Sequence, residues 1–286
     1  NSFFWLSKET SIIINNWFMM YFLSVVLIGT IYPIFLEVLS SQKISVGPPF
    51  YHKLIIPFLI PFLMAMAIGP KLKWIKSNIV DKFYLVLFFA ISIVLSFLIV
   101  KKFSTNLLIN TILVSSALYL FFITLRDFFI RKYSNISQNI AHFGFSLLIL
   151  SILLNNLFSS EIITNLKVGE TFTSSKTKIV FKNINQKQEK NYKSIIANFS
   201  IENINETIED LSPELRIYNQ PNIVTSEADI KTTLLSDKFI VINIVQNQDY
   251  FNVRYQVKPF MLWIWISVIL ISFGGLLSFF KREHEK

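Results

Sequence analysis

The side chain best suited to chemistry in this sequence is the imidazole of His142. It lies in the run 139–144 (NIAHFG), about one turn inside an apolar stretch long enough to cross a bilayer. Ionisable groups inside hydrocarbon are costly and are usually functional. Neutral imidazole is the common axial ligand of haem iron, and a small residue two positions on gives room for a planar ring. The alternative is that His142 hydrogen-bonds a neighbouring helix, and chemistry alone leaves both interpretations open.

The other polar candidates have simpler interpretations. Glu37, followed by a lysine in the next loop, favours a solvated helix end over a proton relay. His52 follows Tyr51 at the mouth of a second apolar run, which favours an interfacial anchor over metal or haem ligation. His284 stands in a charged tail, and we expect it to be solvated.

Prolines and tryptophans mark two of the apolar runs. Pro57 and Pro61 should kink or stop the second run, because proline cannot donate the backbone hydrogen bond of a helix interior. Trp263 and Trp265 open the last run, where indoles usually anchor a helix to the membrane interface. Neither feature by itself indicates a binding site.

Several classes of chemistry are excluded by what the sequence lacks. It has no cysteine, which excludes disulfides, thiolate nucleophiles and Cys-ligated metals. It also has no G-x-G-x-x-G, G-K-[ST] or H-E-x-x-H motif. The formal charge is +9, but residues 159–258 carry twelve basic and twelve acidic side chains, so the excess lies in and between the apolar runs. We therefore expect no nucleic-acid partner.

The elements that must position His142 are membrane helices. Of the 286 residues 52% are hydrophobic and 16% charged, with a mean hydropathy of +0.51, so a bilayer must be the solvent. We expect an α-helical polytopic membrane protein with an inserted β-rich domain. Residues 1–158 should hold about five transmembrane helices, 159–256 an outward-facing β-rich domain, and 257–286 a final helix with a short charged tail. The six apolar runs are 14–39, 50–68, 83–100, 107–125, 140–158 and 259–280.

The basic residues between the runs predict the orientation. By the positive-inside rule their three clusters face the cytoplasm or the mitochondrial matrix, so residues 159–256 face outward. No signal peptide is visible, and Asn1 in place of Met leads us to expect a processed chain or part of a longer one. The clusters contain Lys71, Lys73, Lys76 and Lys82; Arg126, Arg131 and Lys132; and Lys281, Arg282 and Lys286.

The outward segment has the alternation typical of strands. Short runs rich in Ile, Val, Phe and Tyr predict a small antiparallel sheet or barrel. The polar residues 182–193 predict a loop or hairpin tip. The expected strands are 178–181, 194–201, 214–218, 239–245 and 251–257.

Several motifs run along essentially the whole chain. They are SKE at 7–9 with NN at 15–16, GTIYP at 29–33, ISVGPPF at 44–50, IGP at 68–70 with Trp74, AHFG at 141–144, LSPELRIY at 211–218, PFMLWIW at 259–265 and GGL at 274–276. In order and spacing these motifs resemble the C-terminal part of the CcmF/NrfE family of cytochrome c biogenesis proteins.

This resemblance implies a subunit or fragment of the haem lyase that attaches haem to apocytochrome c. His142 matches the family histidine that gives one axial ligand to a membrane b-type haem, which keeps the incoming haem iron reduced. The second axial ligand and the tryptophan-rich haem-handling segment belong to the part of the family preceding Ser7, so this chain alone should not be a complete lyase. Where the family has asparagine the chain has His52, to which we assign no role.

The resemblance also implies partners and a location. The expected partners are the N-terminal part of the same protein or a split-gene product, the proteins that carry haem and handle apocytochrome c, and apocytochrome c itself. The expected location is the bacterial cytoplasmic membrane or the mitochondrial inner membrane, with residues 159–256 on the periplasmic or intermembrane-space side. A scaffold that binds no haem, and a transport permease using the kinked second helix, are the alternatives.

Overall fold

The structure, a computed structural model, describes residues 7–40, 43–74, 82–103, 106–130, 135–175, 177–203, 208–245 and 249–284. The chain divides into two compact units. One comprises Asn1–Leu153 with Trp265–Lys286, and the other comprises Leu154–Ile264. We call them the membrane unit and the β unit.

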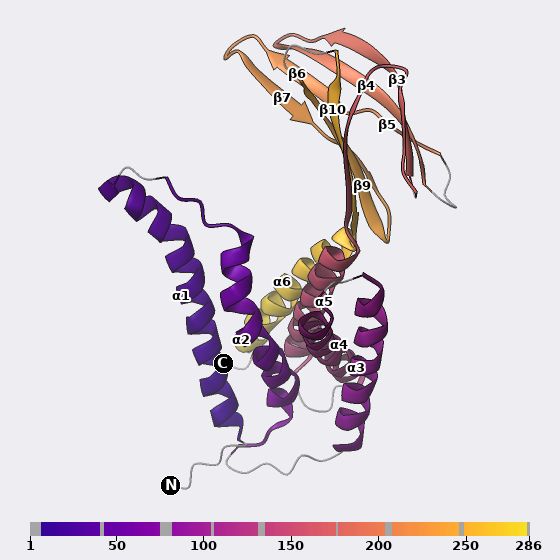
Figure 1. The fold of residues 1–286 in the computed structure, drawn as a ribbon. Coiled ribbons are helices and arrows are strands. Elements are labelled where there is room, and N and C mark those ends of the chain that lie inside the picture. The colour runs from indigo at the N-terminus through magenta and orange to yellow at the C-terminus, as the bar shows by residue number, and fades with distance from the viewer. Residues whose placement is uncertain are drawn as a thin grey trace. The chain divides into compact units, whose positions relative to one another are not determined.

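Six long helices carry the apolar runs (Figure 1). Each contains a candidate span of at least 20 residues that is apolar enough to cross a membrane. The chain is therefore a multi-pass helical membrane protein with an inserted β-rich domain, which confirms the predicted fold class. The helices are α1 (Lys8–Ser40), α2 (Pro48–Ile68), α3 (Lys82–Phe103), α4 (Leu107–Ile130), α5 (Ile136–Phe158) and α6 (Met261–His284), with a 3-10 turn, η1 (Gly69–Lys71), after α2.

Pro57 and Pro61 were predicted to kink or stop the second span; that they stop it is wrong, and the kink stays a prediction. Helix α2 runs on through Pro57 and Pro61 and ends at Ile68, before η1. Each proline removes one backbone hydrogen bond, but packing against neighbouring helices keeps a membrane helix intact across such a gap. Helix α2 has these neighbours, because it packs against both α1 and α4.

Helix α4 is the centre of the membrane unit. It is the most buried of the six helices and packs against α2 and α3. A hydrogen bond of 2.7 Å between Thr124 Oγ1 and Ser146 Oγ joins it to α5. Polar links of this kind hold helices together where lipid tails provide no hydrophobic driving force.

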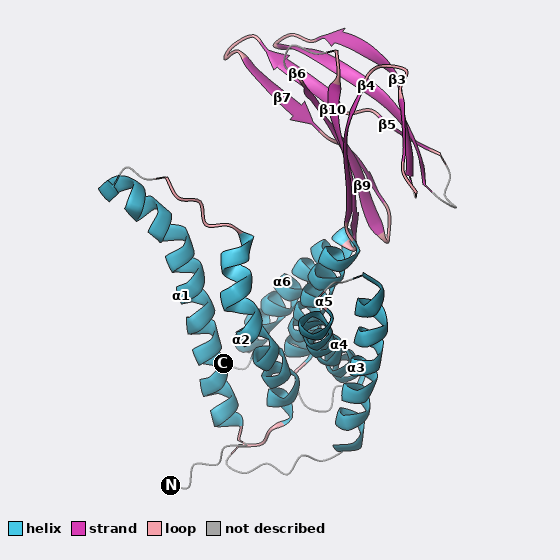
Figure 2. Cartoon of the chain, viewed as in Figure 1, coloured by secondary structure: helices cyan, strands magenta, loops and turns pink. Residues whose placement is uncertain are grey.

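The β unit contains two antiparallel sheets (Figure 2). One has the order β1-β10-β9-β8. The other has the order β2-β3-β4-β6-β7, with β5 paired to β4. The strands are β1 (Ser160–Leu166), β2 (Thr171–Thr173), β3 (Thr177–Gln188), β4 (Tyr192–Asn203), β5 (Glu209–Leu211), β6 (Glu214–Tyr218), β7 (Ile223–Glu227), β8 (Asp229–Thr232), β9 (Ser236–Ile244) and β10 (Phe251–Pro259).

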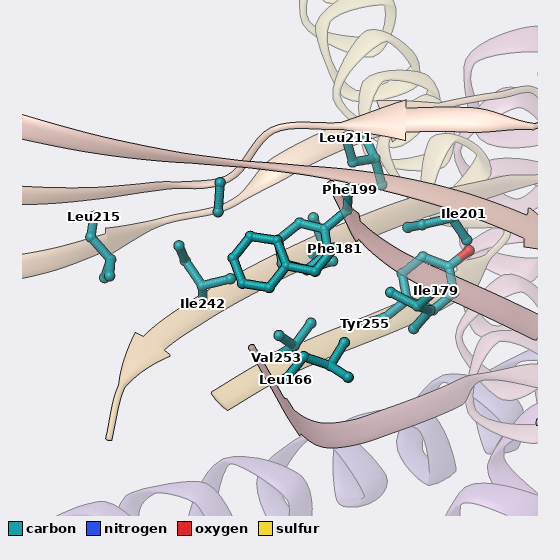
Figure 3. Close-up of a cluster of buried hydrophobic side chains, with 12 residues drawn as sticks. Leu166, Ile179, Phe181, Phe199, Ile201, Leu211, Leu215, Ile242, Val253 and Tyr255 are labelled. Atoms are coloured by element: carbon teal, nitrogen blue, oxygen red, sulfur yellow. The ribbon is translucent and has the colours of Figure 1, made fainter. Parts of the chain in front are cut away.

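Both sheets contribute to one apolar core (Figure 3). Phe181 and Phe199, on adjacent strands of the larger sheet, stack with ring centroids 4.4 Å apart. From the smaller sheet, Ile242, Val253 and Tyr255 are buried in the same cluster. Alternating inward residues from two facing sheets are the signature of a sandwich, so the predicted β-rich domain consists of two layers around a shared core.

Residues 182–193, predicted as a loop or hairpin tip, form the outer end of the hairpin between β3 and β4. Strands β3 and β4 pair from Thr177 with Asn203 to Gln188 with Lys193, and only residues 189–191 turn between them. In the outer half of this hairpin most of the β3 side chains are polar and exposed to solvent. The hairpin alternative is therefore confirmed, and the loop alternative is wrong.

The junction between β10 and α6 has an unusual backbone. Phe260 adopts a φ of 61°, a left-handed conformation that is uncommon for a bulky side chain. Its amide donates a hydrogen bond of 2.8 Å to the Leu235 carbonyl, and the Pro259 carbonyl accepts one of 2.5 Å from Asn155 Nδ2. These bonds fix the point where the strand becomes a helix.

Candidate functional site

His142 borders a groove in the membrane unit. It lies on α5, six residues after Ile136, and is half-buried. The groove has a volume of about 370 Å³ and is formed by α1, α2, η1 and α5. Pockets for small molecules and cofactors begin at about 300 Å³. The side chains around His142 in this groove include Asn15, Met19, Phe62, Met66, Gln138 and Phe145.

The imidazole of His142 is available for a ligand. Within the described part of the chain, no group forms a hydrogen bond with it. An axial ligand of haem iron needs one ring nitrogen without a proton and without a competing partner. The residues present therefore fit a haem ligand at the wall of a mostly apolar groove, and the interpretation of His142 as a helix-joining hydrogen bond has no such bond among these residues.

A buried polar cluster lies against His142. Lys71 of η1 forms an ion pair with Asp127 of α4, and their side chains are only 2% and 13% exposed. Asn139 of α5 donates a hydrogen bond of 3.1 Å from Nδ2 to the Asp127 carbonyl. The cluster thus joins η1, α4 and α5 at the level of His142.

A small cavity separates this cluster from the imidazole. Its volume of about 10 Å³ suits a single water molecule, and its lining includes Thr124, Asp127, Asn139 and His142. Asp127 Oδ1 is buried there with no hydrogen-bond partner among the described residues. A water in this cavity would satisfy that oxygen.

Gly144 was expected to leave room for a planar ring beside His142, but it faces helix α6. A Cβ at this position would come within 3.0 Å of Ile271 and Leu270 on α6. On the opposite helix, a Cβ on Gly274 would lie 2.7 Å from the backbone nitrogen of Ala141. The small residue two positions after His142 therefore gives room to a neighbouring helix, and the room for a ligand lies on the groove side of α5.

Two basic residues of this region have structural roles beyond the orientation that they indicate in the sequence. They are Lys71 and Arg126. Lys71 is buried in the ion pair, and the Arg126 guanidinium lies 3.6 Å from the ring centroid of Tyr84, a cation–π contact. The overlooked signal was Asp127, a carboxylate inside an otherwise apolar run, because such a residue needs a partner.

The remaining sequence candidates lie outside the groove. Glu37 and Lys43 form an exposed ion pair of 3.6 Å, as a solvated helix end would. His52 is exposed near the start of α2. Trp263 Nε1 donates a hydrogen bond of 2.9 Å to the Leu234 carbonyl, and the side chain of His284 lies outside the described residues.

Part of the orientation argument also lies beyond what is described. The structure describes Lys71 and Lys73 of the first basic cluster and Arg126 of the second. The others lie outside the described residues or have side chains that do: Lys76, Lys82, Arg131, Lys132, Lys281, Arg282 and Lys286.

A family model matches the β unit. Residues 157–259 match the model described as the CcmF C-terminal beta-sandwich. This agrees with the two facing sheets and their shared core.

Curated proteins match the chain beyond the β unit. A cytochrome c-type biogenesis protein CcmF of Pseudomonas fluorescens is 27% identical over 98% of this chain and 44% of its own length. The CcmF of Escherichia coli K12 is 24% identical over 100% of this chain and 45% of its own length. The chain thus spans less than half the length of these relatives.

A solved structure has the same fold. It is titled "Cytochrome c Heme Lyase CcmF" and superposes with a TM-score of 0.73 at 19% identity. The match covers 96% of this chain and 46% of the solved one. The likeness extends over both the helices and the sheets.

Proposed function

Because the chain belongs to the CcmF family of cytochrome c-type biogenesis proteins and matches its C-terminal part, we propose that it acts in cytochrome c maturation. It serves there as a subunit or fragment of the membrane haem lyase that attaches haem to apocytochrome c. The observation that carries this role is the imidazole of His142 at the wall of a cofactor-sized groove, with no hydrogen bond to any residue that the structure describes.

In this proposal His142 is one axial ligand of a b-type haem in the membrane. A haem held there would supply one-electron chemistry for reducing the iron of the incoming haem. The chain's own contribution is to hold the imidazole: Asn139 and Asp127 tie α5 to α4 below it, and Ser146 ties the same helices one turn above it. The second axial ligand comes from outside this chain.

The β unit has a separate role, contact with the partner proteins. It faces the periplasm or the intermembrane space, where apocytochrome c and the haem-carrying maturation proteins are met. The membrane helices lie in the bacterial cytoplasmic membrane or the mitochondrial inner membrane. The boundaries proposed for these parts are 1–158, 159–256 and 257–286. The N-terminal part of the same protein, or a split-gene product, completes the lyase, in keeping with a chain that spans less than half of its relatives.

The reduced-minus-oxidised optical spectrum tests this role. The chain is co-expressed with the missing N-terminal part and purified as wild type, His142→Ala and His52→Ala. The exposed His52 on α2 provides a matched histidine control. We expect a low-spin b-type signal that is lost in His142→Ala and kept in His52→Ala.

The opposite outcome identifies the alternative role. A signal unchanged in His142→Ala contradicts ligation by this residue. If cytochrome maturation then still depends on the chain, a scaffold that binds no haem itself is the better interpretation. A flux of small molecules in vesicles without any cytochrome partner would instead support a permease.

A further inference from the structure

The tip of the hairpin between β8 and β9 consists of two exposed leucines. Leu234 and Leu235 are 71% and 68% exposed. They lie between Thr233 and Ser236, which close the turn through a hydrogen bond of 3.0 Å from the Thr233 amide to the Ser236 carbonyl. Tight turns usually carry Gly, Asn, Asp, Pro or Ser. Neither leucine belongs to the core of the β unit, so packing inside the unit does not explain them.

This tip is bonded to the first turn of α6. The Leu235 carbonyl accepts the hydrogen bond of the Phe260 amide, at 2.8 Å. The Leu234 carbonyl accepts that of the Trp263 indole, at 2.9 Å. Both backbone carbonyls therefore point at the start of α6, within the β unit, and the two leucine side chains remain exposed.

The start of α6 fixes the level of the tip relative to a bilayer. Residues Met261–Phe280 form a candidate span of 20 residues, which is about 30 Å of helix and matches the hydrocarbon thickness. The first turn of such a span, with its tryptophan, belongs at the boundary between water and lipid. A turn hydrogen-bonded to that helical turn lies at the same boundary.

We propose that Leu234 and Leu235 insert into the lipid bilayer beside the first turn of α6 and anchor the β unit to the membrane surface. The occupant is lipid acyl chain, because the tip is hydrogen-bonded to the first turn of α6, the turn at which this candidate span enters the bilayer. The proposal is independent of haem ligation by His142.

The lack of cysteine allows a direct test, because a single introduced thiol can be labelled in the full chain. The variant Leu235→Cys carries an environment-sensitive nitrobenzoxadiazole probe at the tip. The matched control is Ile244→Cys, also an exposed apolar position, at the other end of β9. Ile244 lies eight positions after Ser236 along the strand, a distance of about 26 Å at about 3.3 Å per residue.

Both labelled proteins are reconstituted in phosphatidylcholine vesicles with and without lipids that carry a nitroxide quencher. We expect blue-shifted emission at position 235 and quenching several-fold stronger than at position 244. Adding Leu234→Ser to the labelled Leu235→Cys variant should weaken the quenching. Thermal unfolding of each variant identifies any loss of fold.

Two results would overturn the proposal. One is a probe at position 235 that is as water-exposed as the probe at 244. The other is equal quenching at both positions, which would assign lipid contact to a face of the β unit and not to its hairpin tip. A partner protein as the occupant gives the first result in vesicles that contain this chain alone.

Discussion

The close contact between α5 and α6 can be tested at two adjacent glycines. A Cβ on Gly274 would lie 2.7 Å from the backbone nitrogen of Ala141 and 2.9 Å from the Ser137 carbonyl oxygen. A Cβ on Gly275 would meet nothing within 4 Å. The same substitution, glycine to alanine, therefore has opposite consequences at neighbouring positions of one helix.

The size of the effect follows from the contact distances. Carbon atoms pack best at about 3.5–4.0 Å, so Gly274→Ala forces α5 and α6 apart by about 1 Å. The groups it meets are backbone and Cβ atoms that cannot rotate away. Overpacking of this kind costs about 1–3 kcal/mol. Gly275→Ala removes a flexible glycine from the helix, and we expect it to be neutral or to stabilise by up to about 1 kcal/mol.

The assay is thermal unfolding of the full chain in detergent, followed by fluorescence, for the two variants and the wild type. We expect Gly274→Ala to lower the midpoint and Gly275→Ala to leave it unchanged or raise it. Because Ala141 precedes His142, the haem spectrum of the co-expressed complex should also shift in Gly274→Ala alone. Equal midpoints for the two variants would refute the inferred α5–α6 contact.

Two further predictions concern charges. Lys71→Met should destabilise the protein by about 3–5 kcal/mol, because it leaves Asp127 buried without a partner. The double variant with Asp127→Leu should recover most of this loss in a double-mutant cycle, and additive losses would contradict the pairing. In the β unit, the hydrogen bond from Lys182 holds the pKa of Asp210 below its usual value of 3.8. The folded form binds the proton less readily than the unfolded chain, so the stabilisation is present above pH 3.8 and is lost as the pH falls through the lowered pKa. Urea unfolding at descending pH should show this loss in the wild type and not in Asp210→Asn.

The fold could be predicted from the sequence where one physical pattern dominates. Each of the six apolar runs became a helix, and the run 214–218 coincides with strand β6. The shortest strands, such as β2 and β5, were not predicted, since three residues are too few to show a period. The polar half of β3 was missed because its exposed side chains resemble those of a loop.

The surroundings of His142 were less accessible to sequence reasoning. The histidine itself stands out, because an ionisable group in a membrane helix is rare. The sequence does not reveal its neighbours, because Lys71 and Asp127 are 56 positions apart and meet only when η1 lies against α4. Gly144 was assigned to the wrong face of α5, since a sequence does not tell which neighbour a small residue admits.

The pairing of β1 with β10 has a consequence for the order in which the two sheets of the β unit form. Ser160 pairs with Val257, about a hundred positions later, whereas β3 and β4 are joined by a short turn. Contacts between neighbouring segments form quickly, and those between distant segments form late. The larger sheet can therefore assemble from local hairpins while β1 is still unpaired. Because β10 lies after β2–β9 in the chain, β1 finds its partner only once those strands have been synthesised, and the smaller sheet is completed after the local hairpins of the larger one.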